Sequence, residues 1–184
     1  MARFRPLVVM STLVLVGLVV AASWGVSAPA NRSEGTMQTA LKAENDGNFK
    51  DAYDQFRHIA LETGANSAEV GQAVEHGVDC LGRLNRIDEA DAFLEAVVEK
   101  HVEDWRVLST VADVYAFRLP HQGFIVAGEF SRGQKRGNTG GKPVNSLARD
   151  RVRSLQLKAQ AMPLAEADTD SAAIGQFFLS VARV

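Results

Sequence analysis

Few side chains in this sequence have the spacing that reaction chemistry needs. His76 and Cys80 stand four residues apart, which on a helix would put an imidazole and a thiolate on one face, within reach of a zinc ion. Two ligands are too few for a zinc site. Glu75 and Asp79 are also four residues apart, but a solvated pair is a simpler interpretation of them than the acid and base of a catalytic site. No serine nucleophile elbow, zinc-protease motif or paired-cysteine motif occurs. The sequence therefore predicts no catalytic residue, no metal, no cofactor and no enzymatic activity.

A second group of polar residues lies in a glycine-rich stretch. Residues 137–142 suggest a phosphate-binding loop, but the glycines are spaced one residue short, Pro143 replaces the metal-binding hydroxyl residue, and no apolar strand precedes them. The surrounding segment 131–144 is expected to be a loop that could hold an anion, an acidic partner or an anionic membrane surface. The bases expected to make that contact are Arg132, Lys135, Arg136 and Lys142. Stacking aromatics are absent from the loop, so nucleic acid is not expected.

An internal repeat organises most of the chain. The stretch 47–61 returns in degenerate form at 86–100, so that Ala52 aligns with Ala90 at a period of 38 residues. Phe56 and Leu94 follow four residues later, a spacing that puts small and large side chains on one helical face. Partner segments with helical spacing precede both copies, which predicts antiparallel helical hairpins. Helices are expected at 35–46, 48–62, 67–84, 87–101 and 104–118.

This pattern resembles the tetratricopeptide repeat, a helical hairpin of about 34 residues. Gly47, Phe49, Ala52 and Phe56 carry the resemblance, whereas the second unit has Asn85 in place of the glycine. The resemblance covers roughly residues 34–118 and implies a surface for binding a protein or peptide, formed mainly by the first helix of each hairpin. The residues implied at that surface are Lys42, Asn45, Gln72, His76 and Asp79. An ordinary antiparallel helical bundle is the alternative.

The amino terminus predicts export. Arg3 and Arg5 precede an apolar run from Leu7 to Val26, and small residues near Ala28 fit a signal-peptide cleavage site. Without cleavage, residues 7–24 would anchor the protein in a membrane. Both outcomes predict the periplasm or cell envelope, the second with anchoring in the inner membrane. The single cysteine, Cys80, excludes an internal disulfide and is expected to be a small buried side chain.

Charge divides the chain into two parts. Residues 34–104 contain sixteen acidic and six basic residues, whereas residues 132–158 contain eight basic residues and only Asp150 as an acid. A sixth helix is expected to start at 124–130. Another is expected after Asn145, and a last one at 171–184. The expected apolar face of the first of these two consists of Val152, Leu155, Leu157, Ala159 and Met162. The final helix carries enough apolar surface that something is expected to cover it.

The C-terminal region has a resemblance of its own. The glycine and arginine loop, with residues 144–157 and 160–165, resembles the N-terminal helical region of large exported bacterial alpha-2-macroglobulin-like proteins. That resemblance implies a helical preface to a protease-trapping molecule. The β-sandwich domains of that family are absent, and Leu81-Gly82-Arg83 follows Cys80 where its thioester has Gly-Glu-Gln.

These features predict an all-α fold of stacked tetratricopeptide-like hairpins. The expected organisation is a signal peptide or anchor at 1–28, a linker at 29–34, helical repeats at 35–130, the basic loop at 131–144 and C-terminal helices at 145–184. The expected function is an exported, non-catalytic protein interaction scaffold. The alternative is a structural N-terminal part of a large alpha-2-macroglobulin-like protein without the thioester region, whose further domains would be the partner.

Overall fold

A computed structural model describes residues 30–133 and 141–184 of the chain. The predicted signal segment and the predicted loop bases Lys135 and Arg136 lie outside these residues. The described helices are α1 (Ala30–Asn45), α2 (Phe49–Leu61), α3 (Ser67–Arg83), the short 3-10 helix η1 (Ile87–Glu89), α4 (Ala90–Lys100), α5 (Trp105–Phe117), α6 (Leu147–Glu166) and α7 (Ser171–Arg183). Three strands, β1 (Gln122–Val126), β2 (Glu129–Arg132) and β3 (Lys142–Asn145), lie between α5 and α6.

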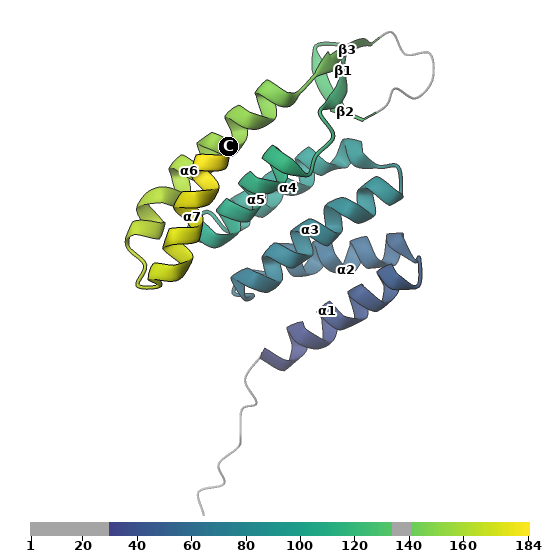
Figure 1. Cartoon of the computed structure of the whole chain (residues 1–184). Helices are drawn as coiled ribbons and strands as arrows, with labels where there is room; N and C mark the ends of the chain where they lie inside the picture. Colours follow the sequence, from purple (N-terminus) through teal and green to yellow (C-terminus); the bar gives the residue numbers. More distant parts are fainter. Residues whose placement is uncertain (1–29, 134–140) are drawn as a thin grey trace, which may run out of the picture.

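The helices stack in chain order, from α1 at one end to α6 and α7 at the other (Figure 1). Helices α1, α3 and α5 contact one another in sequence and form one layer, which we call the first-helix layer. Helices α2 and α4 contact each other behind it, and α6 packs along α5. The five helices expected up to residue 118 are confirmed, although α1 begins at Ala30, within the predicted linker. The fold is mostly helical with one small sheet.

The repeated turn explains why the second copy tolerates asparagine. Gly47 ends the first helix with a φ of 79°, and the next amide, of Asn48, donates to the carbonyl of Ala43. Asn85 ends α3 with a φ of 61°, and the amide of Arg86 donates to the carbonyl of Leu81 in the same pattern. Asparagine is the residue that most often replaces glycine in this left-handed position. Both copies therefore end their first helix in one way.

The predicted small-beside-large packing is present in the core. Ala52 and Ala90 are fully buried, and so are Phe56 and Leu94 four residues later. An alanine at a helix contact lets the two backbones approach closely, while the larger side chain fills the space beside the contact. The alignment of the two copies thus identifies equivalent core positions.

The helix expected to start at residues 124–130 is wrong, because this segment forms a β-hairpin. Strand β1 pairs antiparallel with β2 on one side and β3 on the other, in the order β2-β1-β3. Ala127 and Gly128 form the two-residue turn with φ values of 51° and 90°. Two successive positive φ values are the geometry of tight hairpin turns, and the β-branched and aromatic residues before them favour a strand. The sheet is an insertion between α5 and α6.

The expected apolar face of α6 is only partly right. Leu157 is fully buried and Met162 packs against the core, but Val152 and Leu155 are exposed, with relative exposures of 55% and 43%, and Ala159 is exposed as well. The buried face instead includes Asp150, Ser154 and Lys158, all at 1% exposure or less. These polar groups are tolerated inside because several have partners: the Nζ of Lys158 donates to the hydroxyls of Ser109 and Ser180 at 2.8 and 2.6 Å. Such partners lie far away in the sequence, so hydrophobic periodicity could not indicate the polar residues of this face.

Among the described residues, no helix combines the length and the apolar character that crossing a membrane requires.

Candidate functional site

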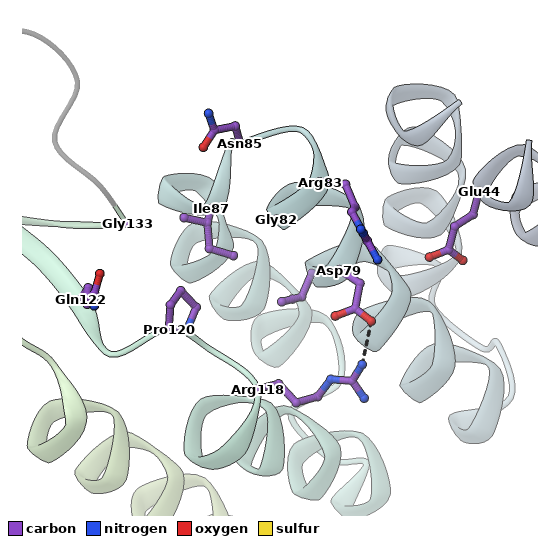
Figure 2. Close-up of a pocket in the computed structure, with 11 residues that line it drawn as sticks. Glu44, Asp79, Gly82, Arg83, Asn85, Ile87, Arg118, Pro120, Gln122 and Gly133 are labelled. Atoms are coloured by element: carbon purple, nitrogen blue, oxygen red, sulfur yellow. Dashed lines mark hydrogen bonds and ion pairs between the residues drawn. The ribbon is translucent and has the colours of Figure 1, made fainter. Parts of the chain in front are cut away.

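A pocket of about 590 Å³ lies on the first-helix layer where the helices meet the sheet. We call it the helix pocket. Its lining comes from α1, α3, the turn after α3, and the segments that enter and leave the sheet: Glu44, Val78, Asp79, Gly82, Arg83, Asn85, Ile87, Arg118, Pro120, Gln122 and Gly133. Figure 2 shows Glu44 on one side and Pro120 and Gln122 on the other, with Asp79, Arg83 and Arg118 between them. The pocket thus combines four charged groups with an apolar wall.

Arg118 joins two helices at the bottom of this pocket. It follows the last residue of α5, and its guanidinium donates to Asp79 at 2.8 Å and to Glu75 at 3.0 Å on α3. All three side chains are more than a third exposed, so water screens the attraction and each pair contributes little to stability. Because of these ion pairs, Asp79 and Arg118 already neutralise each other's charge within the pocket.

Arg83 differs from Arg118 because its guanidinium has no ion-pair or hydrogen-bond partner within residues 30–133 and 141–184. It lies at the exposed end of α3, four residues after Asp79. Glu44, on the other side of the pocket, is paired with His76, whose Nδ1 lies 2.7 Å from the Glu44 carboxylate. Arg83 is therefore the charged lining group whose charge is not matched by a partner among the described residues, whereas Arg118 already contacts two carboxylates.

The wall on the sheet side depends on a close approach at Gly133. This residue has a φ of 94°, and a Cβ atom placed there would lie 2.6 Å from Cγ2 of Ile87. Its amide donates to the carbonyl of Gln122 at 2.8 Å, which closes the end of the hairpin. Only glycine accommodates both the backbone angle and the contact, so this contact fixes where the sheet meets η1.

A buried ion cluster holds the sheet against the helices. Arg132 of β2 donates to Asp150 of α6 and to Asp91 of α4, with Nη2 distances of 2.7 and 2.9 Å. Burial opposes ionisation of Asp150, but hydrogen bonds from Arg132, Ser146 and His121 outweigh it and lower its pKa to about 2. Burial likewise opposes the charge of Arg132, and the two carboxylates more than offset it, which raises its pKa. Because Gly133 follows Arg132 in the chain, the cluster also fixes the position of Gly133.

The five residues implied as partner contacts do not lie together. Asp79 lines the helix pocket, whereas Gln72 lines a separate, smaller pocket of about 250 Å³ between α3 and α5. His76 is partly covered because it pairs with Glu44 and its ring stacks on Phe56. Lys42 is exposed and paired with Asp46, and Asn45 is exposed at the end of α1.

The expectation that Arg132 belongs to an anion-binding loop needs correction. Its side chain has no exposed surface, because its donors are used by Asp91, Asp150, Ser146 and the carbonyl of Pro120. Lys142 is exposed on β3, while Lys135 and Arg136 lie outside the described residues. Arg132 therefore stabilises the fold and does not offer its charge to a ligand.

The candidate zinc pair is not a site in this geometry. Cys80 is fully buried, and burial raises the pKa of its thiol to about 12, which opposes the thiolate that binds metal. Within the described residues, no group of three or more His, Cys, Asp or Glu side chains could hold a metal ion.

Asp79 is the one lining residue of this pocket that was among the expected contacts; those that were not include Glu44, Arg83, Arg118 and Gln122. Arg83 could have been found, since it lies one helical turn after Asp79 on the same helix. Gln122 could not, because its position depends on a sheet that the sequence pattern did not indicate.

No family model matches this chain, and neither the curated proteins nor the solved structures contain a significant match.

Proposed function

We propose that this protein is an exported, non-catalytic interaction scaffold that binds a polypeptide segment on its first-helix layer. The observation that carries the proposal is the helix pocket, which is lined by residues from two helices of that layer, from the end of a third and from the inserted sheet. A pocket of about 590 Å³ falls in the range of roughly 300–1,000 Å³ typical of ligand sites.

The lining favours a polypeptide over an enzymatic substrate. Asp79, Arg118 and Glu44 are engaged with protein partners, which leaves no base poised beside a nucleophile. Val78, Ile87 and Pro120 supply apolar contact surface, while Asn85 and Gln122 supply amide groups that can donate to and accept from a peptide backbone. Such a mixture suits the alternating side chains and backbone amides of a bound segment.

Export remains part of the proposal and rests on the sequence. The apolar run from Leu7 to Val26 follows two arginines and ends near small residues, which is typical of a signal peptide or an uncleaved anchor. The helical hairpins, and the equivalent burial of Ala52 and Ala90, support a tetratricopeptide-like arrangement within the proposal.

Filling the pocket tests the function. A library of displayed random peptides is selected on the full chain, and an enriched peptide is then titrated against two variants. Gly82 lines the pocket, and a Cβ atom there would meet nothing within 4 Å; Gly175 of α7 has the same open surroundings away from the pocket. We expect Gly82→Trp to abolish binding and Gly175→Trp to leave it unchanged. Failure to enrich any peptide, or equal binding to both variants, would refute the proposal.

A second candidate is a structural role within a larger alpha-2-macroglobulin-like protein. The exposed apolar residues Val152 and Leu155 of α6 and Leu179 of α7, which is 61% exposed, favour it, because a covering domain of a larger chain would remove their apolar surface from water. In that case the chain by itself should self-associate through these exposed apolar residues. The double variant Val152→Lys, Leu155→Lys should reduce that self-association. Peptide binding at the helix pocket should not depend on it.

A further inference from the structure

The helix pocket continues onto the sheet. A second pocket of about 400 Å³, which we call the sheet pocket, is lined by His121, Gln122, Gly123, Phe124, Gly133, Pro143, Val144 and Asn145. Gln122 and Gly133 line both pockets, so the two adjoin at the end of the β1-β2 hairpin. We call these two adjoining pockets together the groove, with α1 and α3 at one end and β1 and β3 at the other.

The two parts of this groove differ in chemistry. The helix pocket holds the guanidinium of Arg83, which has no partner among the described side chains. The sheet pocket contains no carboxylate, lysine or arginine, and Phe124, Pro143 and Val144 give it an apolar surface. A ligand with an anionic group near Arg83 and an apolar group over the sheet pocket would complement both parts.

The groove favours contact across the sheet over extension of the sheet. Strand β3 is an edge strand, but Pro143 within it has no amide hydrogen to donate. A segment that continued the sheet would lose that hydrogen bond. An extended chain that lies across the pockets does not need a hydrogen bond from Pro143, because the side-chain amides of Gln122 and Asn145 can bond to its backbone.

Charge limits how acidic the ligand can be. Residues 34–104 carry sixteen acids and six bases, so a strongly acidic segment would be repelled as it approached. Glu44 and Asp79 line the same pocket but are paired with His76 and Arg118, so a single carboxylate in direct contact with Arg83 can still form a charge-assisted, bidentate hydrogen bond. A single acid among uncharged residues fits both conditions.

We propose that the groove binds an extended polypeptide segment in which one Asp or Glu side chain pairs with Arg83 and a neighbouring apolar side chain occupies the sheet pocket. This inference rests on the proposed function and specifies its ligand. Arg83 acts as the specificity-determining residue, and the apolar side chain over Phe124 and Pro143 sets the direction of the segment.

A double-mutant cycle tests the pairing with Arg83. The probe is a synthetic peptide from the displayed library that binds the full chain and is blocked by Gly82→Trp. Arg83→Ala should weaken its binding about tenfold, since a hydrogen-bonded charge pair is lost. Replacing the acidic residue of the peptide by its amide should cause the same loss, and combining both changes should cause little more. Arg57→Ala, which removes an exposed arginine from α2, is the matched control and should have no effect.

The sheet pocket is tested with Pro143→Glu, which places a carboxylate at an exposed lining position. It should weaken the same peptide, and truncating the apolar residue of the peptide should remove the difference between this variant and the wild type. Enrichment of basic peptides, additive losses in the cycle, or unchanged binding to Arg83→Ala would overturn the inference while leaving the proposed function intact. If the proposed function itself were wrong, the preceding selection would fail, because no enriched peptide would be blocked by Gly82→Trp.

Discussion

Arg132 and Asp150 form a bidentate ion pair in which neither side chain has exposed surface, with Nη2 2.7 Å from Oδ1 and Nη1 2.9 Å from Oδ2. One residue lies at the end of β2 and the other in the first turn of α6, so the pair ties the inserted sheet to the helical stack. Since Gly133 follows Arg132 and lines both pockets, the shape of the groove depends on this pair.

The first prediction concerns the pH dependence of this pair. Asp150→Asn should destabilise the protein by about 3–5 kcal/mol at neutral pH, because it leaves a buried guanidinium without its closest countercharge. The folded pKa of Asp150, about 2, is below its unfolded value of about 4, so its contribution is present above the unfolded value and is lost as the pH falls through the folded one. Urea unfolding should show the gap between variant and wild type narrowing between about pH 4 and pH 2.

The control for this prediction is Asp88→Asn, which changes an exposed carboxylate. Its difference from the wild type should be small at every pH. A gap for Asp150→Asn that stays constant down to pH 2 would show that the carboxylate is not held ionised by Arg132.

The second prediction concerns the contact between the sheet and η1. Gly133→Ala should destabilise by about 2–4 kcal/mol, because it adds both an unfavourable φ and a clash with Ile87. Gly128→Ala has a similar φ of 90° but open space around the added atom, so it isolates the backbone cost. In thermal unfolding, Gly133→Ala should have a lower melting temperature than Gly128→Ala. Adding Ile87→Ala to each variant should bring the two melting temperatures closer. Equal losses for the two single variants would argue against the close approach.

The third prediction concerns the repeat alignment. Ala90→Glu should cost about 3–5 kcal/mol by placing a charge at a fully buried helix contact, and Ala52→Glu should do the same at the equivalent position. Ala92→Glu changes an exposed alanine of the same helix, α4, and should be nearly neutral. An unchanged melting temperature for both buried variants would refute the equivalence of the two copies.

The fourth prediction concerns Lys158, whose Nζ lies 2.9 Å from Asp113 of α5 as well as against Ser109 and Ser180. Burial lowers the pKa of Lys158, and its hydrogen bond with Asp113 opposes this only in part. Lys158→Met keeps most of the volume, and the Asp113 side chain that it leaves without a cation is 37% exposed to water, so this variant should stay within about 1 kcal/mol of the wild type. Lys158→Ala should lose about 2–4 kcal/mol through the cavity it leaves. Equal losses in chemical denaturation would show that the charge, and not the volume, holds α5, α6 and α7 together.

The helices up to residue 118 could be predicted because each has its own local signals. Apolar residues recur with helical spacing, and Gly47 or Asn85 marks where a first helix ends. The sheet could not be predicted so easily, because β1 and β2 are short and the glycines around them also suit a loop. The polar residues on the buried face of α6 were missed for a different reason: Asp150 and Lys158 are inside only because Arg132, Asp113 and two serines reach them from distant segments.

The candidate site could be anticipated only in small part. Asp79 was among the implied contacts and lines the helix pocket, since helical spacing indicates which side of α3 it occupies. Arg132 was misassigned, since composition cannot tell an exposed base from one that is paired inside the protein. Gln122 and Gly133 became visible only once the sheet was in place.

Mapping a bound peptide by amide chemical shifts tests the central claim most directly. The full chain, labelled with nitrogen-15, is titrated with the selected peptide that Gly82→Trp blocks. The largest changes should fall on Gly82, Arg83, Asn85, Gln122 and Gly133, with none at Leu155 or Gly175. Changes concentrated on α6 and α7, or spread evenly over the described residues, would contradict binding in the groove.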